Sequence, residues 1–224
     1  MKFILPRNLG TGIPSPFFIA CEGMSDARLI DELLQHLGIE NCRVGCPSRD
    51  SVGGEGKDSL PKYLANVQNV LQQRNTALEG ILVIADADDS RETSFTAVKK
   101  ALQFAEFPVP LKPFSIEELK PRAAVYLIPG EGRDGTLEHI LLEAAFAKNN
   151  KLEGCINTFL ECIGNVDCTP NKDAKMRMSS LIGATCQDNP WASAAVIWSE
   201  THNPVPIDSP SFDHLSDFLR RFSA

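Results

Sequence analysis

The chain has little of what a membrane protein or a disulfide-stapled secreted protein needs. None of its apolar runs approaches the roughly 20 residues of a membrane helix. Its seven cysteines are odd in number, include no Cys-x-x-Cys pair, and are spread over 224 residues, a length that needs no disulfides. We therefore expect a cytoplasmic protein without membrane contact, whose cysteines are reduced and serve as small buried side chains.

Basic residues and tyrosines are also scarce. The chain holds 22 Lys and Arg against 29 Asp and Glu, so its average surface does not attract nucleic acid, although a local basic patch remains compatible with this balance. The two tyrosines, Tyr63 and Tyr126, lie in patterns typical of buried side chains, which argues against covalent tyrosine chemistry. A hydrophobic content of 43% favours one α/β domain with an appendage.

Short apolar runs alternate with amphipathic segments in the first two thirds of the chain. The pattern predicts strands at 17–21, 41–46, 80–85 and 123–128, and helices at 25–37, 59–71, 92–105 and 136–147. Such alternation predicts an α/β domain over residues 16–147, with a mostly parallel sheet flanked by helices. The Pro- and Gly-rich residues 1–15 are expected to form an irregular N-terminal arm.

Residues 148–224 differ in character from the preceding domain. Their periodicity predicts helices at 152–163, 173–186 and 212–222, so we expect a mainly helical C-terminal appendage packed on the same domain. Trp191 and Trp198 are expected to anchor this appendage on the sheet.

Acidic residues follow three of the predicted strands. These are Glu22 and Asp26, then Asp86, Asp88 and Asp89, then Glu131, Asp134 and Glu138. Because the carboxyl ends of parallel strands share one edge of the sheet, we expect several of these side chains to converge there. Carboxylates held together repel one another unless a cation compensates them, and all-oxygen ligation suits Mg²⁺ or Mn²⁺. The sequence therefore predicts a metal site at this edge.

Two of these acidic motifs carry a resemblance to a known family. Glu22-Gly23-x-x-Asp26 at a strand-to-helix turn, followed by Asp86-x-Asp88 after a buried strand, resembles the Toprim domain. This domain is found in topoisomerases, bacterial primases and the overcoming-lysogenization-defect (OLD) nucleases. The segment from Gly135 to Glu138 also resembles a group of stand-alone Toprim-like proteins. The resemblance covers about residues 15–147 and implies a Toprim-like, Rossmann-like fold.

The resemblance also implies a function and roles for individual residues. It implies that Asp86 and Asp88 hold Mg²⁺ or Mn²⁺, and that Glu22 is a metal ligand or the general acid/base, which makes these three the catalytic set. Asp26 would contribute to a second metal position, with Glu138 as a weaker candidate. The implied activity is that of a metal-dependent nuclease acting on DNA or RNA, with a protein partner such as an ATPase possible. Because Asp89 stands where the family often has glycine, its role is open.

Three lysines are candidates for contact with an anionic substrate. Lys57 ends a glycine-rich loop just ahead of a predicted helix, although Ser51 and Asp58 do not match a P-loop. Lys172 and Lys175 in the appendage can line a surface for a phosphate backbone, with a solvated helix face as the alternative interpretation.

Two other functions compete with the nuclease hypothesis. Asp86-Ala87-Asp88-Asp89-Ser90 also fits the loop of a haloacid-dehalogenase-like phosphatase, with Asp86 as nucleophile and Asp88 as general acid. The complete strand and helix that carry Glu22 and Asp26 upstream argue against it, because that loop normally opens its fold. The other alternative is a non-catalytic module of Toprim shape that binds metal, nucleic acid or a partner protein, which the acidic net charge favours.

Overall fold

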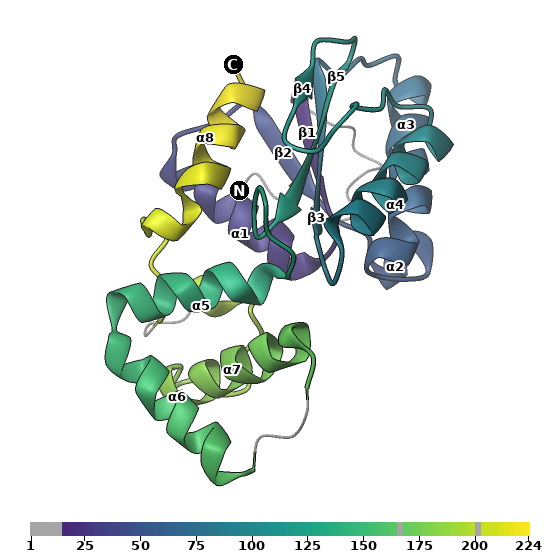
Figure 1. The fold of residues 1–224 in the computed structure, drawn as a ribbon. Coiled ribbons are helices and arrows are strands. Elements are labelled where there is room, and N and C mark those ends of the chain that lie inside the picture. The colour runs from purple at the N-terminus through teal and green to yellow at the C-terminus, as the bar shows by residue number, and fades with distance from the viewer. Residues whose placement is uncertain (1–14, 165–167, 200–202) are drawn as a thin grey trace.

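A computed structural model describes residues 15–164, 168–199 and 203–224 (Figure 1). The predicted arm at 1–15 lies outside the described residues except for Ser15. The described residues form a five-stranded sheet in the order β2-β1-β3-β5-β4. Strands β1 (Phe17–Cys21), β2 (Cys42–Gly45), β3 (Gly80–Asp86) and β5 (Arg122–Ile128) run parallel, and the short β4 (Ile116–Glu117) is antiparallel to β5. The prediction of an α/β fold with a mostly parallel sheet is confirmed.

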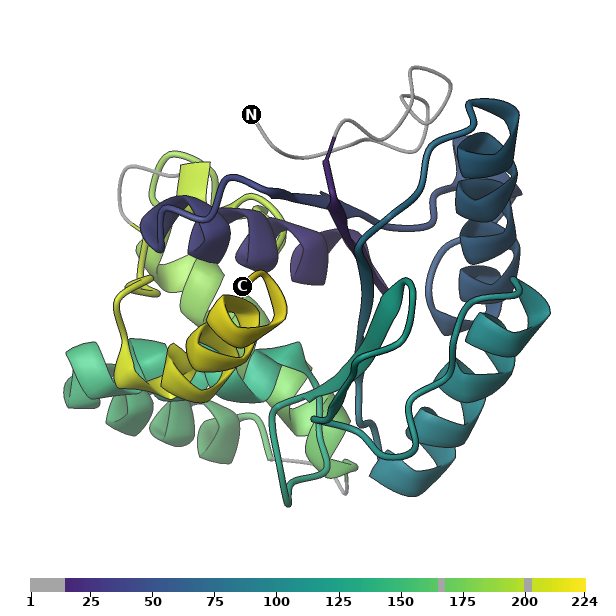
Figure 2. The same ribbon diagram turned by 90° about the horizontal axis from the view of Figure 1, so that it is seen from above.

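Both faces of the sheet are covered by helices. Helices α3 (Leu60–Gln73) and α4 (Arg91–Phe104) lie on one face, and α1 (Met24–His36) and α8 (Asp213–Phe222) lie on the other (Figure 2). In β3, Ile81 and Val83 belong to the core cluster under α3 and α4, whereas Leu82 and Ile84 belong to the cluster on the opposite face. This double burial explains why β3 is a continuous apolar run rather than an alternating one.

Three further helices lie beyond the carboxyl ends of the strands. They are α5 (Leu137–Lys148), α6 (Asn150–Cys162) and α7 (Pro170–Thr185) (Figure 1). Their buried side chains, such as Leu141 and Leu181, belong to the same core cluster as α1 and one sheet face. The C-terminal part is thus helical, as expected, and it shares a core with the sheet. The predicted division at residue 147 falls at the end of α5 and stays a prediction.

Helix α8 ties the C-terminal part to the sheet. The ring of Phe222 packs edge-on against Phe17 with centroids 5.4 Å apart, and Arg122 donates a hydrogen bond to the Phe222 carbonyl oxygen at 3.1 Å. Trp198 packs against the core, but the prediction for Trp191 is wrong, because its side chain lies in a surface turn and is 91% exposed.

The remaining elements are short and were not predicted. Helix α2 (Arg49–Val52) and the 3-10 turn η2 (Lys57–Ser59) lie in the glycine-rich loop, and η3 (Ile197–Ser199) and η4 (Pro210–Phe212) precede α8. All seven cysteines are free. Four are buried as predicted, namely Cys21, Cys42, Cys46 and Cys186, whereas Cys155 and Cys162 on α6 are exposed, so the prediction is wrong for these two. Within the described ranges, no helix is long and apolar enough to cross a membrane.

Candidate functional site at the carboxyl edge of the sheet

The parallel pairing of β1 and β3 brings Glu22 and Asp86 together. Cys21 is paired with Ile84, so Glu22 follows β1 at the level where β3 ends. The Glu22 N–H donates to the Ile84 carbonyl oxygen at 2.9 Å, and the Asp86 N–H donates to Glu22 Oε2 at 3.2 Å. The Glu22 carboxylate therefore reaches across to the end of the neighbouring strand, as the sequence predicted from topology alone.

The loops that follow β3 and β5 are joined by backbone hydrogen bonds. Asp88 and Gly135 exchange two of these bonds, each 2.7 Å long. Gly135 has a φ of +137°, and a Cβ atom there would stand 3.0 Å from the ring of His139, so the close approach favours glycine. This junction sets the start of α5 against β3, where the Leu137 N–H donates to Asp86 Oδ1 at 2.9 Å. Helix α5 thus presents its positive end to Asp86.

Asp26 and Glu138 bring two more carboxylates to the same place. Asp26 lies in the first turn of α1, is only 6% exposed, and accepts a hydrogen bond from the Gly23 N–H through Oδ2 at 3.0 Å. Asp26 Oδ1 and Glu138 Oε2 are buried, and neither has a hydrogen-bond partner in the described part of the chain. A buried polar atom of this kind costs about 1–3 kcal/mol unless water or an ion satisfies it.

Burial raises the pKa of three carboxyl groups in the cluster, those of Asp26, Asp86 and Glu22. Burial, together with the negative charge of Glu22, raises the pKa of Asp26 to about 7. Burial also raises the pKa of Asp86 well above its usual value, with Asp26, Glu22 and Glu138 adding to the shift. The pKa of Glu22 is raised by burial as well, and the nearby Lys57 ammonium opposes that shift. The cluster therefore holds more negative charge than its surroundings compensate.

Lys57 brings a positive charge into contact with the cluster. Its Nζ donates to Asp88 Oδ2 at 2.5 Å, to Ser94 Oγ at 2.9 Å and to the Asp86 carbonyl oxygen at 3.0 Å. Glu22 Oε2 lies 3.6 Å from the same ammonium. The sequence singled out Lys57 only as a weak substrate contact, whereas the structure places it among the predicted metal ligands.

The other acidic residues after β3 and β5 have partners outside the cluster. Asp89 Oδ1 accepts a hydrogen bond from Asn171 Nδ2 on α7 at 2.8 Å. Asp134 Oδ1 accepts from the backbone N–H of Arg91 at 2.9 Å, and Glu131 lies 3.9 Å from His214 Nε2. These three acids therefore tie loops and helices together.

The lysines of α7 stand apart from the carboxylates. Lys172 and Lys175 are exposed, and no ion pair links them to the cluster in the residues that the structure describes. They are nevertheless on the helix whose first turn contacts the Asp89 loop through Asn171. Their role as a substrate surface stays a prediction.

Two polar residues at the site were missed by sequence reasoning. Ser94 is 3% exposed on the inner face of α4, where it donates to the Ala87 carbonyl oxygen and accepts from Lys57. A serine on the buried face of an amphipathic helix is a usable signal. Asn171 carries no such signal, because its contact with Asp89 spans 82 positions in the chain.

The donor set suits a hard divalent cation, although the carboxylates are not yet arranged around one. Across residues 15–164, 168–199 and 203–224, no three acidic, cysteine or histidine side chains converge closely enough to ligate one ion. The unpartnered oxygens of Asp26 and Glu138, together with Glu22 and Asp86, nevertheless offer the all-oxygen ligation that Mg²⁺ and Mn²⁺ prefer. The residues present therefore fit such an ion in their donor chemistry, and their present positions do not surround one.

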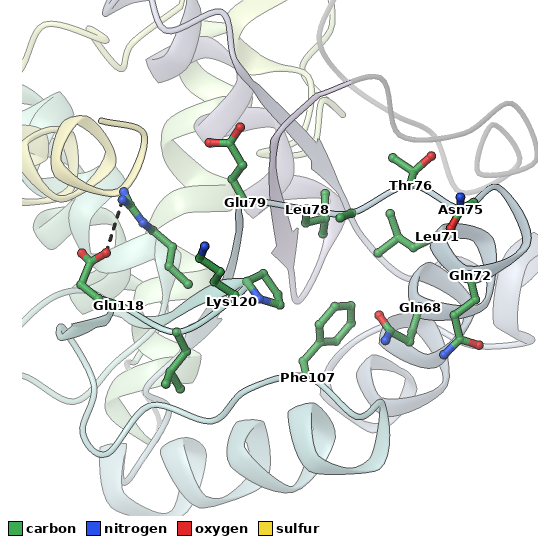
Figure 3. A pocket seen from close by; sticks show the side chains of 14 residues that line it. Gln68, Leu71, Gln72, Asn75, Thr76, Leu78, Glu79, Phe107, Glu118 and Lys120 are labelled. Atoms are coloured by element: carbon green, nitrogen blue, oxygen red, sulfur yellow. Dashed lines mark ion pairs between the residues drawn. The ribbon is translucent and has the colours of Figure 1, made fainter.

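A cavity of about 800 Å³ opens at the other edge of the sheet. It is lined by the end of α3, the segment before β3 and the start of β5, including Leu78, Phe107 and Pro121 (Figure 3). Its charged residues are solvent-accessible, and Glu118 pairs with Arg122 at 3.4 Å. None of the lining residues belongs to the carboxylate cluster.

The fold and the site define an α/β protein of Rossmann-like architecture, with a helical C-terminal part and a buried carboxylate cluster at the strand ends. The model of a family described as "Protein of unknown function (DUF3226)" matches residues 16–224, and the chain belongs to this family. Searches of the curated proteins and of the solved structures found no match.

Proposed function

We propose that the chain is a cytoplasmic, Toprim-like phosphodiesterase that cleaves nucleic acid with the help of Mg²⁺ or Mn²⁺ at the carboxylate cluster. The observation that carries the proposal is the burial of Asp26, whose Oδ1 lacks a partner among the described residues although Glu22 and Glu138 repel its charge. Burying mutually repelling carboxylates destabilises a fold unless they take up protons or a cation binds to them, and the bound cation leaves them ionised.

Each carboxylate of the cluster takes a distinct role in this proposal. Asp86 and Asp88 would hold the metal ion, with Glu22 as a further ligand or as the general acid/base, and the unpartnered oxygens of Asp26 and Glu138 would serve a second position. A bound Mg²⁺ supplies Lewis-acid stabilisation of the charge that develops on a phosphodiester. Glu22, whose pKa is raised by burial, is the residue placed to give or take a proton at the reacting oxygen.

The surroundings of the cluster support access by an extended anion. Helix α7 contacts the Asp89 loop through Asn171 and carries Lys172 and Lys175 on its exposed side. These lysines support the approach of a phosphate backbone. Because the net charge of the chain is -7, we further propose that a protein partner such as an ATPase contributes affinity for the nucleic acid.

The test is a nuclease assay on labelled DNA and RNA, single- and double-stranded, with Mg²⁺ or Mn²⁺. We expect Glu22→Gln to slow cleavage by roughly 10²-fold or more, because it removes a ligand and a proton-transfer group. Glu79→Gln is the matched control, since Glu79 is an exposed acid at the opposite end of β3. Equal cleavage by wild type and Glu22→Gln would sink the mechanism.

A non-catalytic binding module is the second candidate function. The observation in its favour is that Lys57 already pairs with Glu22 and Asp88, so the cluster has a partial counter-charge of its own. This candidate predicts binding of nucleic acid or of a protein partner without cleavage in any variant.

A small phosphomonoester in the same assay tests the haloacid-dehalogenase-like alternative, which predicts its hydrolysis with Asp86 as nucleophile.

A further inference from the structure

We propose that Lys57 is a displaceable internal cation, whose ammonium holds the carboxylate cluster together in the metal-free chain and must leave Asp88 and Glu22 before a divalent ion can bind. This inference rests on the proposed metal site and adds a competitor to it. It gives Lys57 a role in setting the metal concentration at which the site becomes occupied.

The contacts of Lys57 use the oxygens that a metal ion would need. An ammonium group has three protons to donate, and Asp88 Oδ2, Ser94 Oγ and the Asp86 carbonyl oxygen accept hydrogen bonds from Lys57 Nζ. The Glu22 carboxylate lies 3.6 Å away. Because Asp88 and Glu22 are turned toward Lys57, an incoming ion competes with the ammonium for the same negative charge. Asp26 and Glu138 have no hydrogen bond or ion pair with Lys57 among the described residues, so the competition concerns Asp88 and Glu22.

The Lys57 side chain has room to move. Lys57 opens the short turn η2 and follows a loop in which Gly53 and Gly56 have φ values of +76° and +75°. A Cβ atom at either glycine would meet nothing within 4 Å, whereas one at Gly54 would clash with Ser59 Oγ, so the loop is open at Gly53 and Gly56 and packed at Gly54. The Lys57 side chain itself is 20% exposed and flexible. Its ammonium can therefore swing toward solvent while staying near the site.

A displaced ammonium gains a new partner when substrate is present. Lysine binds phosphate as a point charge, and a phosphodiester at the metal site would lie within reach of the released side chain. Lys57 then compensates carboxylates in the metal-free chain and phosphate in the loaded one.

The experiment is a Mn²⁺ titration followed by the electron paramagnetic resonance signal of the free ion. Lys57→Met keeps an unbranched side chain one atom shorter than lysine and removes its charge, and Lys62→Met is the control because Lys62 is an exposed lysine on α3. We expect Lys57→Met to bind Mn²⁺ about tenfold more tightly than wild type, and Lys62→Met to match wild type. We also expect Lys57→Met to melt at a lower temperature in chelator, since the buried carboxylates lose their counter-charge.

The outcomes separate this inference from the proposed function. Unchanged or weaker Mn²⁺ binding by Lys57→Met overturns the role of Lys57 and leaves the metal site intact. Binding by Lys57→Met alone supports Lys57 as the resident cation and overturns the metal-dependent nuclease. Binding by neither protein overturns both. If Lys57→Met does not fold in chelator, refolding on addition of Mn²⁺ supports the inference, and failure to refold overturns it.

Discussion

The two ends of strands β3 and β5 differ in how far the charged side chains around them are exposed to solvent. At the amino ends, the cavity of about 800 Å³ is lined by apolar side chains such as Leu78 and by accessible polar groups such as Glu79, and its ion pair between Glu118 and Arg122 is partly solvated. At the carboxyl ends, Asp26 and Asp86 are buried beside other acids, and burial raises the pKa of both. Water reaches the first group of side chains, whereas the second group is shielded from water and its members repel one another.

The cavity and the buried carboxylates with raised pKa values therefore lie at opposite ends of the strands. A cavity lined by well-solvated side chains imposes no strain that a ligand would relieve. A cluster of buried like charges does impose such strain, and shifted pKa values of this kind concentrate at functional sites. We therefore assign the chemistry to the carboxyl edge.

The largest expected effect is the loss of metal-dependent stabilisation in the double variant Asp86→Asn with Asp88→Asn. At a concentration about a hundred times its dissociation constant, Mg²⁺ or Mn²⁺ should stabilise wild type by about 2.7 kcal/mol, which raises the melting temperature by roughly 5–10 °C. The double variant should show no such rise when both proteins are melted with and without metal. A rise that survives the substitutions would remove the metal site from this edge.

Much of the fold was predictable because its elements carry strong local patterns. The strand predicted at 80–85 is β3, Gly80–Asp86, since a continuous apolar run specifies a strand buried on both faces. The helix predicted from residue 173 begins earlier, at Pro170, where Thr169 caps it and accepts a hydrogen bond from Lys172. A threonine followed by proline was the overlooked start signal. Trp191 was beyond prediction, because hydrophobicity alone does not reveal which aromatic side chain finds a packing partner.

The candidate site was predictable only where topology determines it. Parallel pairing places Glu22 beside Asp86, so strand order and register suffice for that contact. The contact of Lys57 with Asp88 depends on the path of a glycine-rich loop, and that of Asn171 with Asp89 on how α7 packs. Neither path is encoded in a local pattern, so the sequence singled out Lys57, Asp88 and Asp89 without their partners, and it missed Asn171.

The second expected effect is a change in how stability depends on pH in Asp26→Asn. The pKa of Asp26 is about 7 in the folded chain, against 3.8 as its ordinary value. The folded state therefore binds more protons than the unfolded state between about pH 4 and 7, and wild-type stability falls as the pH rises through this window. Removing the charge should stabilise the metal-free protein by about 1–3 kcal/mol above pH 7 and flatten the slope.

The measurement is urea unfolding in chelator from pH 4 to 8. Glu22, Glu138 and Asp86 also face Asp26, as do the buried thiols Cys21 and Cys46, so some slope should remain in the variant. Glu79→Gln, which changes an exposed acid at the opposite end of β3, should keep the wild-type slope. If Asp26→Asn also keeps it, the buried charge is not where the structure places it.

The smallest effect should come from filling the cavity at the amino edge with Ala77→Trp. Ala77 is exposed and lines this cavity, so an indole there occupies open space without entering a packed core. We expect the free energy of unfolding to change by no more than about 0.5 kcal/mol, and Mn²⁺ affinity and nuclease activity to stay within about twofold of wild type. A loss of cleavage of about tenfold or more, with folding intact, would place a functional surface at the amino edge. The amino ends of the strands would then contribute to substrate binding, and the carboxyl ends would hold the charged cluster.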